Sequence, residues 1–239
     1  MLFTGEMNMC CCVTKIAYLF VPELLLLTVA TDTTDGFSRY LRSAEVNGLQ
    51  GKVIGMGEEW LGGDMAYPGG GHKINLLKKE IATLAEDNDN LVLMFTDAYD
   101  VLVLADEQTI LSRFKELDAR VVFSAEPFCW PDNGLADAYP EVEEGDKRYL
   151  NSGGFIGYAK DIVGILQVRE VKDTDDDQLY YTRVFLDPEL RAKFNIKLDT
   201  KSFIFQNLNG ATGIYLSCNF CKHFRDMTPC HDILFTPHR

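Results

Sequence analysis

The sequence is short of positive charge. It has 23 lysine and arginine residues against 36 aspartate and glutamate residues, a formal net charge of −13 at pH 7. Nucleic-acid binding favours a basic stripe or patch, so this balance argues against a nucleic-acid partner. It is compatible with a cationic partner, or with a site that accepts phosphate only after a metal ion has bound.

Long uncharged apolar runs are also absent. No segment reaches the roughly 20 residues that cross a bilayer, so no transmembrane helix is expected. Residues 16–21 resemble a short signal core, but they run through Pro22 and Glu23 into LLLLTVA (24–30), and no small-x-small cleavage site is evident. We therefore expect residues 1–23 to be an atypical leader, and the N-terminus gives no clear secretory signal.

The seven cysteines are odd in number and clustered, which does not fit a disulfide framework. Residue types that bind zinc gather near the C-terminus, at Cys218, Cys221, His223, Cys230 and His231. The interval from Cys221 to Cys230 is short for a zinc ribbon or finger. The spacing favours an unpacked tail, and zinc stays open as an alternative.

What is present fits one large globular domain, since the chain has 239 residues and 46% of them are hydrophobic. Strand-like apolar runs alternate with segments of helical spacing. The expected strands are 24–30, 52–56, 91–95 and 120–125, and the expected helices are 36–47, 73–85, 107–114, 161–170 and 178–186. This alternation predicts an α/β fold with a mostly parallel central sheet. The long loop 126–148 is of a length that is usually functional or disordered.

The most informative stretch is LVLMFTDAYDVLVLAD (91–106), where two carboxylates follow a strand that reads as buried on both faces. Ligands in such sheets collect at the carboxyl ends of the strands. A turn there lets Asp97 and Asp100 offer oxygen ligands to a hard cation such as Mg²⁺ or Mn²⁺, which suits a diphosphate. Solvated loop charges or helix N-caps are the alternative reading of this short motif.

Seven segments together resemble a known family. They are GEEWLGGD (57–64), GGGHKINLLKKE (69–80), MFTDAYD (94–100), FSAEPFCWPD (123–132), RYLNSGGFIGYA (148–159), DTDDDQLYYTRVFLDP (173–188) and KSFIFQNLNGA (201–211). In this order they resemble the N-terminal glycosyltransferase domain of the procollagen lysyl hydroxylases and, more distantly, the collagen galactosyltransferases. The resemblance covers residues 24–211 and implies a GT-A-like glycosyltransferase domain.

The resemblance also implies roles for donor-site residues. Asp97 and Asp100 match the family's pair that binds Mn²⁺ and the diphosphate of a UDP-sugar. Tyr99, between them, matches the residue that lies against the uridine ring. Thr31 and Trp60 match further positions of the donor pocket.

An acidic run and a glycine turn complete the expected site. Asp176 and Asp177 match a family segment implicated in activity, and a carboxylate there can stabilise a cation-like sugar or accept the acceptor's proton. Without the flanking resemblance, such a run reads as a solvated surface. Asn151, Ser152 and Gly153 begin a turn in which backbone can approach the ligand closely.

Other conspicuous residues are given plainer roles. The segment GGGHK (69–73) lacks the ending of a Walker phosphate loop. We expect His72 at the surface rather than as a ligand, and Lys73 is a further candidate phosphate contact. Cys129 and Trp130 are expected to serve packing in the core or loop.

The resemblance stops after Ala211. The family continues to a His-Gly-Asn segment whose histidine is a further metal ligand, whereas residues 212–239 form a divergent tail rich in cysteine and histidine. With two protein ligands we expect weaker Mn²⁺ binding and a poor or inactive transferase. The family's Fe²⁺, 2-oxoglutarate and ascorbate serve a C-terminal dioxygenase domain, whose ligand pattern this sequence lacks, so no lysine hydroxylation is expected.

The resemblance thus implies a transferase that uses UDP-glucose or UDP-galactose and Mn²⁺ to modify hydroxylysine-linked acceptors on collagen, in the endoplasmic reticulum. A catalytically weak or inactive module that binds nucleotide sugar or collagen is the alternative. The sugar and the oligomeric state stay open.

Overall fold

The fold is known from a computed structural model, which describes residues 23–64, 68–85, 88–210 and 234–236. In these ranges no helix has the length and apolar character needed to cross a membrane. The divergent tail and its cysteines and histidines lie almost entirely outside the described residues, so the zinc alternative stays untested.

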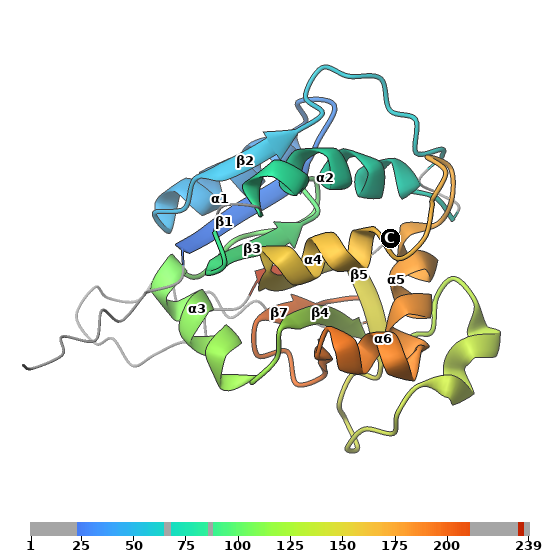
Figure 1. The fold of residues 1–239 in the computed structure, drawn as a ribbon. Coiled ribbons are helices and arrows are strands. Elements are labelled where there is room, and N and C mark those ends of the chain that lie inside the picture. The colour runs from blue at the N-terminus through green and yellow to red at the C-terminus, as the bar shows by residue number, and fades with distance from the viewer. Residues whose placement is uncertain (1–22, 65–67, 86–87, 211–233, 237–239) are drawn as a thin grey trace, which may run out of the picture.

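An open six-stranded sheet forms the centre of the molecule (Figure 1). Its strands are β1 (Glu23–Val29), β2 (Gly51–Ile54), β3 (Leu91–Thr96), β4 (Val121–Glu126), β5 (Tyr149–Tyr158) and β6 (Ile196–Asp199), in the spatial order β2-β1-β3-β5-β4-β6. β5 runs antiparallel to both of its neighbours, and the other three pairings are parallel. The predicted α/β class with a mostly parallel sheet is therefore confirmed.

Helices cover both faces of this sheet. They are α1 (Asp35–Val46), α2 (Gly71–Leu84), α3 (Glu107–Glu116), α4 (Ala159–Leu166), α5 (Asp177–Leu186) and α6 (Pro188–Lys193), with the 3-10 helix η1 (Asn133–Ala138) in the long loop. A separate two-stranded sheet pairs β7 (Phe205–Asn207) with β8 (Leu234–Thr236).

The two faces are packed by alternate residues of the same strands, as a period of two requires. In β3, Leu93 and Phe95 join the core beneath α2, α4 and α5, which cross in front of the sheet in Figure 1. Val92 and Met94 join the opposite core, which includes residues of α1 and α3. Because β3 is buried on both faces, its end is a sheltered point from which polar side chains can project.

The sequence reading differs from the structure in several elements, and the ten-residue strand β5 was not among the expected strands. The helix expected at 161–170 ends at Leu166, where the hydroxyl of Tyr180 donates to the carbonyl oxygen of Ile165 (2.8 Å) and takes the place of a further helical bond. The short α6 and β6 were not predicted, since neither is long enough to show a clear period.

An irregularity in β5 shapes the site. The partner of β4 moves from Phe155, opposite Phe123, to Asn151, opposite Ser124. On the other side of β5, Gly154 pairs with Thr96 of β3. Residues 152–154 (Ser-Gly-Gly) therefore leave the β4 ladder and lie toward the end of β3, a common use of bulges beside functional sites.

Candidate active site

A single cavity of about 1030 Å³ collects the predicted residues at the carboxyl ends of β1, β3 and β4. This is the edge where ligands bind in open α/β sheets. All ten predicted site residues line it: Thr31, Trp60, Asp97, Tyr99, Asp100, Asn151, Ser152, Gly153, Asp176 and Asp177. The structure thus brings them together, and the role of each stays a prediction.

Buried polar groups hold the end of β3 in place. The amide of Asp97 donates to the carbonyl oxygen of Gly153 (2.9 Å). Behind it, the Thr28 hydroxyl donates to the Thr96 carbonyl (2.8 Å), and the Thr96 hydroxyl donates to the Tyr40 hydroxyl (3.0 Å). A Cβ added to Gly153 would lie 3.1 Å from Asp97 Oδ2, so glycine lets this carboxylate lie against the β5 backbone.

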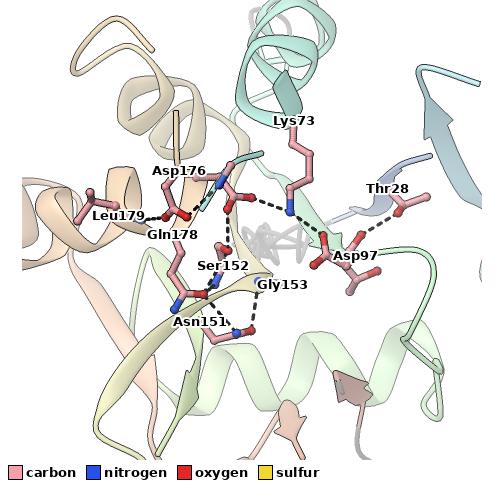
Figure 2. A network of polar contacts seen from close by, with 12 residues as sticks. Thr28, Lys73, Asp97, Asn151, Ser152, Gly153, Asp176, Gln178 and Leu179 are labelled. Atoms are coloured by element: carbon pink, nitrogen blue, oxygen red, sulfur yellow. Dashed lines mark hydrogen bonds and ion pairs between the residues drawn. The ribbon is translucent and has the colours of Figure 1, made fainter. Parts of the chain in front are cut away.

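Lys73 is the buried cation of the site, and Figure 2 shows its ammonium group between two carboxylates. Its Nζ lies 3.0 Å from Asp97 Oδ1 and 2.6 Å from Asp177 Oδ2, and the residue is 7% exposed. Burial by itself lowers the pKa of Lys73, but the charges and hydrogen bonds of the two aspartates outweigh it and raise the pKa overall. The lysine therefore stays charged and links the end of β3 to the start of α5.

The two predicted catalytic aspartates lie in different environments. Asp176 caps α5, because its Oδ1 accepts from the amide of Leu179 (2.6 Å), while its Oδ2 accepts from the amide of Gly69 (3.2 Å). Burial raises the pKa of Asp176. Asp177 pairs with Lys73 and also accepts from the Ser152 hydroxyl (3.3 Å). One carboxylate is held by backbone amides and the other by a cation.

A second buried carboxylate, Glu126, closes β4 and is held by amide side chains. Gln178 Nε2 donates to its Oε1 (2.7 Å), and Asn209 Nδ2 donates to its Oε2 (2.8 Å). The Gln178 carbonyl accepts in turn from the amide of Ser152 (3.1 Å) and from Asn151 Nδ2 (3.4 Å). The arrangement fixes the glycine turn of β5 against the start of α5.

Aromatic residues form the other end of the cavity. The Tyr99 hydroxyl accepts from the amides of Thr31 (3.0 Å) and Asp32 (3.2 Å), and the residue remains 40% exposed. Trp60 donates through Nε1 to the Gly63 carbonyl (2.8 Å). The polar end of each ring is held by backbone, and both rings line the cavity, where aromatic side chains suit a planar ligand such as a nucleobase.

The candidate metal ligands are two carboxylates, Asp97 and the exposed Asp100. No three histidine, cysteine, aspartate or glutamate side chains gather as a metal site within the described ranges. Two hard oxygen donors beside a large cavity fit a divalent ion whose remaining ligands come from phosphate and water, as is usual for such ions at nucleotide sites. The residues present therefore fit Mn²⁺ shared with a nucleotide.

Two expectations for neighbouring residues were wrong. His72 is buried (7% exposed), because α2 begins at Gly71 and places its imidazole beneath the loop that carries Trp60. Trp130 is 47% exposed at the cavity, whereas packing in the core or loop was expected. Cys129 is buried in the core as expected, and its thiol donates to the Asp132 carbonyl (3.3 Å).

Sequence reasoning missed Glu126, Gln178 and Asn209, and it gave Lys73 only a minor role. Glu126 could have been found by the argument used for Asp97, since both stand at the end of a buried apolar strand. Gln178 and Asn209 carry no comparable local signal, because their partner is distant in sequence.

Comparison with known proteins agrees with this geometry. A family model described as the PLOD GT domain matches residues 21–223. The human multifunctional procollagen lysine hydroxylase and glycosyltransferase LH3 is 53% identical over 192 residues, which cover 80% of this chain and 26% of that protein. Procollagen-lysine,2-oxoglutarate 5-dioxygenase of Drosophila melanogaster is 50% identical over 189 residues, covering 79% and 26%. A Caenorhabditis elegans multifunctional procollagen lysine hydroxylase and glycosyltransferase is 50% identical over 193 residues, covering 80% and 26%.

The chain spans about a quarter of the length of these relatives. The family model covers most of the sequence, and the α/β fold with its cavity at the strand ends agrees with the match. The resemblance noted in the sequence is confirmed, and the chain belongs to the PLOD GT domain family of the procollagen lysyl hydroxylases.

Proposed function

We propose that this domain is a Mn²⁺-dependent glycosyltransferase that moves glucose or galactose from a UDP-sugar to a hydroxylysine-linked acceptor in collagen. The observation that carries the proposal is the convergence of Asp97, Tyr99 and Asp100 in one cavity of a chain that the PLOD GT domain model matches. Relatives named as procollagen lysine hydroxylases and glycosyltransferases support procollagen as the partner, and the location that goes with this proposal is the endoplasmic reticulum, as the family resemblance implies.

The donor lies at the aromatic end of the cavity in this proposal. Tyr99 and Trp60 offer ring faces to the base, and Thr31 borders the same space. Asp97 and Asp100 would hold Mn²⁺ against the diphosphate. When bound there, the ion supplies Lewis-acid stabilisation of the negative charge on the departing UDP, an effect worth several kcal/mol.

Lys73 adds a charge that belongs to the protein. Its ammonium group is shared between Asp97 and Asp177, and both lie on the cavity wall. A bound diphosphate competes with Asp97 for this cation, so Lys73 can turn toward phosphate while it keeps its bond to Asp177. Negative charge that develops on the leaving group is thereby met by a group already in place.

The carboxylates at the start of α5 serve the acceptor. As the bond between the sugar and the phosphate oxygen breaks, the acceptor hydroxyl forms the new bond to the sugar and its proton must leave. Asp176 is the better proton acceptor, since burial raises the pKa of its carboxyl toward that of a useful base. Asp177 lies beside it and can stabilise positive charge on the sugar.

A non-catalytic module that binds nucleotide sugar or collagen is the second candidate. It is favoured by one observation: within the described residues the metal-ligand candidates are two carboxylates, and no group of three or more is present. A weakly held ion would leave donor binding possible and turnover slow.

Calorimetric titration of UDP with and without Mn²⁺ tests the donor site. Binding should require Mn²⁺ and weaken at least about tenfold in an Asp97→Ala, Asp100→Ala variant, since loss of even one charged ligand costs more than about 1.4 kcal/mol. A Glu143→Ala, Glu144→Ala variant removes two exposed charges elsewhere and should bind like the unaltered chain.

Absence of UDP binding by the unaltered chain would refute the donor site. Where binding is present, release of UDP in the presence of collagen acceptors distinguishes the two candidates. Turnover supports the transferase, and binding without turnover supports the module.

A further inference from the structure

The structure places His72 at a junction that the proposed mechanism does not use. Its imidazole is buried in the first turn of α2, yet it does not line the cavity. It packs edge-on against Trp60, with ring centroids 5.4 Å apart and planes at 77°. Trp60 does line the cavity, so any influence of His72 on a ligand passes through the indole ring.

On its other side His72 is tied to Asp173. Its Nδ1 lies 3.2 Å from Asp173 Oδ1, which also accepts from Asn75 Nδ2 (2.8 Å). The hydrogen bonds from Asn75 and His72 lower the pKa of Asp173, so its carboxylate can only accept. The network therefore assigns the hydrogen to His72 Nδ1 and fixes the plane of the ring.

The backbone joins the same two segments. The amide of His72 donates to the Asp173 carbonyl (2.9 Å), and the amide of Gly71 donates to the Asp175 carbonyl (2.7 Å). An antiparallel bridge between Gly70 and Asp176 continues this pairing. Backbone hydrogen bonds thus join the glycine segment before α2 to the acidic segment before α5, and His72 lies at one end of this pairing.

We propose that His72 is a positioning residue that couples the ring of Trp60 to the acidic segment 173–177. Trp60 borders the donor end of the cavity, and the acidic segment carries Asp176 and Asp177, so one imidazole sets the relation between the two. The inference rests on the proposed function for its consequence, since it predicts that donor affinity responds to Asp173, which does not line the cavity and acts on Trp60 through His72.

Two tryptophans occur in the chain, so a Trp130→Phe background makes Trp60 the sole indole fluorophore. In that background Asp173→Ala should shift the Trp60 emission and weaken binding of UDP with Mn²⁺ about three- to tenfold, close to the range set by the net loss of one typical hydrogen bond. Asp173→Asn keeps an acceptor oxygen and should restore most of the signal. Glu170→Ala, which removes an equal but exposed charge paired with Lys78 outside this segment, should change neither.

The decisive experiment introduces Asp173→Ala into a His72→Phe background. Phenylalanine keeps a ring against Trp60 but has no N–H group to donate to Asp173. Coupling through the imidazole requires that the effect of Asp173→Ala nearly vanishes there. An equal effect in both backgrounds, or an unchanged Trp60 emission in the first, overturns the proposal. The fluorescence measurement needs no nucleotide, so it tests the coupling even if the chain does not bind UDP. Unfolding curves of each variant distinguish a loss of coupling from a loss of fold.

Discussion

Two walls of the cavity bury carboxylates by different means. At the wall where α2 meets α5, Asp177 is paired with the ammonium group of Lys73. At the wall where β4 ends, Glu126 is 1% exposed and its oxygens accept from the amides of Gln178 and Asn209. At the first wall the carboxylate is paired with a cation, and at the second it accepts hydrogen bonds from neutral amides.

The difference teaches how each wall responds to a ligand. Lys73 is shared between Asp177 and Asp97, so a charged ligand can redistribute its bonds. The hydrogen bonds around Glu126 link β4, β5, α5 and the segment after β7. Their donors are uncharged amides, which attract an incoming phosphate less strongly than an ammonium group does. The ion-paired wall is suited to receive charge, and the amide wall is suited to hold shape.

The largest expected effect breaks the ion-paired wall. Lys73→Met leaves Asp177 buried beside Asp97 without a cation, and we expect the free energy of unfolding to fall by about 3–5 kcal/mol in urea titrations. Adding Asp177→Asn should recover much of the loss, since the stranded charge is then gone.

Lys52→Met is the matched control for that change. Lys52 pairs with Glu80, and the two side chains are 42% and 33% exposed, so the expected loss is about 0–1 kcal/mol. Equal losses in the free energy of unfolding for Lys73→Met and Lys52→Met would show that burial does not make the Lys73 pair more critical than the exposed one.

A smaller effect is expected at the amide wall. Gln178→Leu removes one donor from Glu126, but Asn209 still donates, so we expect a loss of about 1.5–3 kcal/mol in the same titrations. Gln167→Leu changes an exposed glutamine and should stay within about 0.5 kcal/mol. A loss larger than that of Lys73→Met would mean that the dipole-held carboxylate is the more critical of the two.

The smallest effect concerns a carboxylate outside the cavity, held by the side chain and the backbone amide of Thr109. Asp106 caps α3 by accepting from the Thr109 amide (2.8 Å), and Asp106→Ala should cost about 1 kcal/mol at neutral pH. Hydrogen bonds from Thr109 lower the pKa of Asp106 from 3.8. Because the pKa of Asp106 is lower in the folded chain than in the unfolded chain, its ionised carboxylate stabilises the fold at pH values above the unfolded pKa. This contribution is lost as the pH falls through the folded pKa.

The difference in unfolding free energy between the unaltered chain and Asp106→Ala should therefore shrink as the pH is lowered through and below 3.8. Urea titrations at successive pH values measure it. A difference that stays constant into acid would show that the cap does not depend on the charge of Asp106.

Local sequence determined many of the helices and strands and identified the two carboxylates at the end of β3. The apolar run before Asp97 predicts a strand buried on both faces, and the spacing of apolar residues predicts α1, α2 and α5. Asp97 and Asp100 were identifiable because a strand end followed by carboxylates is a local pattern. Trp60, Tyr99 and the segment that begins at Asn151 were found through the family resemblance.

Tertiary structure alone decided which charges meet. Lys73 and Asp177 are over 100 positions apart, and nothing in either neighbourhood predicts a bond of 2.6 Å between them. The antiparallel course of β5 likewise follows from where the chain returns to the sheet, and it brings Gly153 beside Asp97. Propensity and period act over a few residues, whereas burial and pairing depend on elements that the whole fold brings together. That is why His72 reads as a surface histidine in the sequence and is buried between Trp60 and Asp173 in the folded protein.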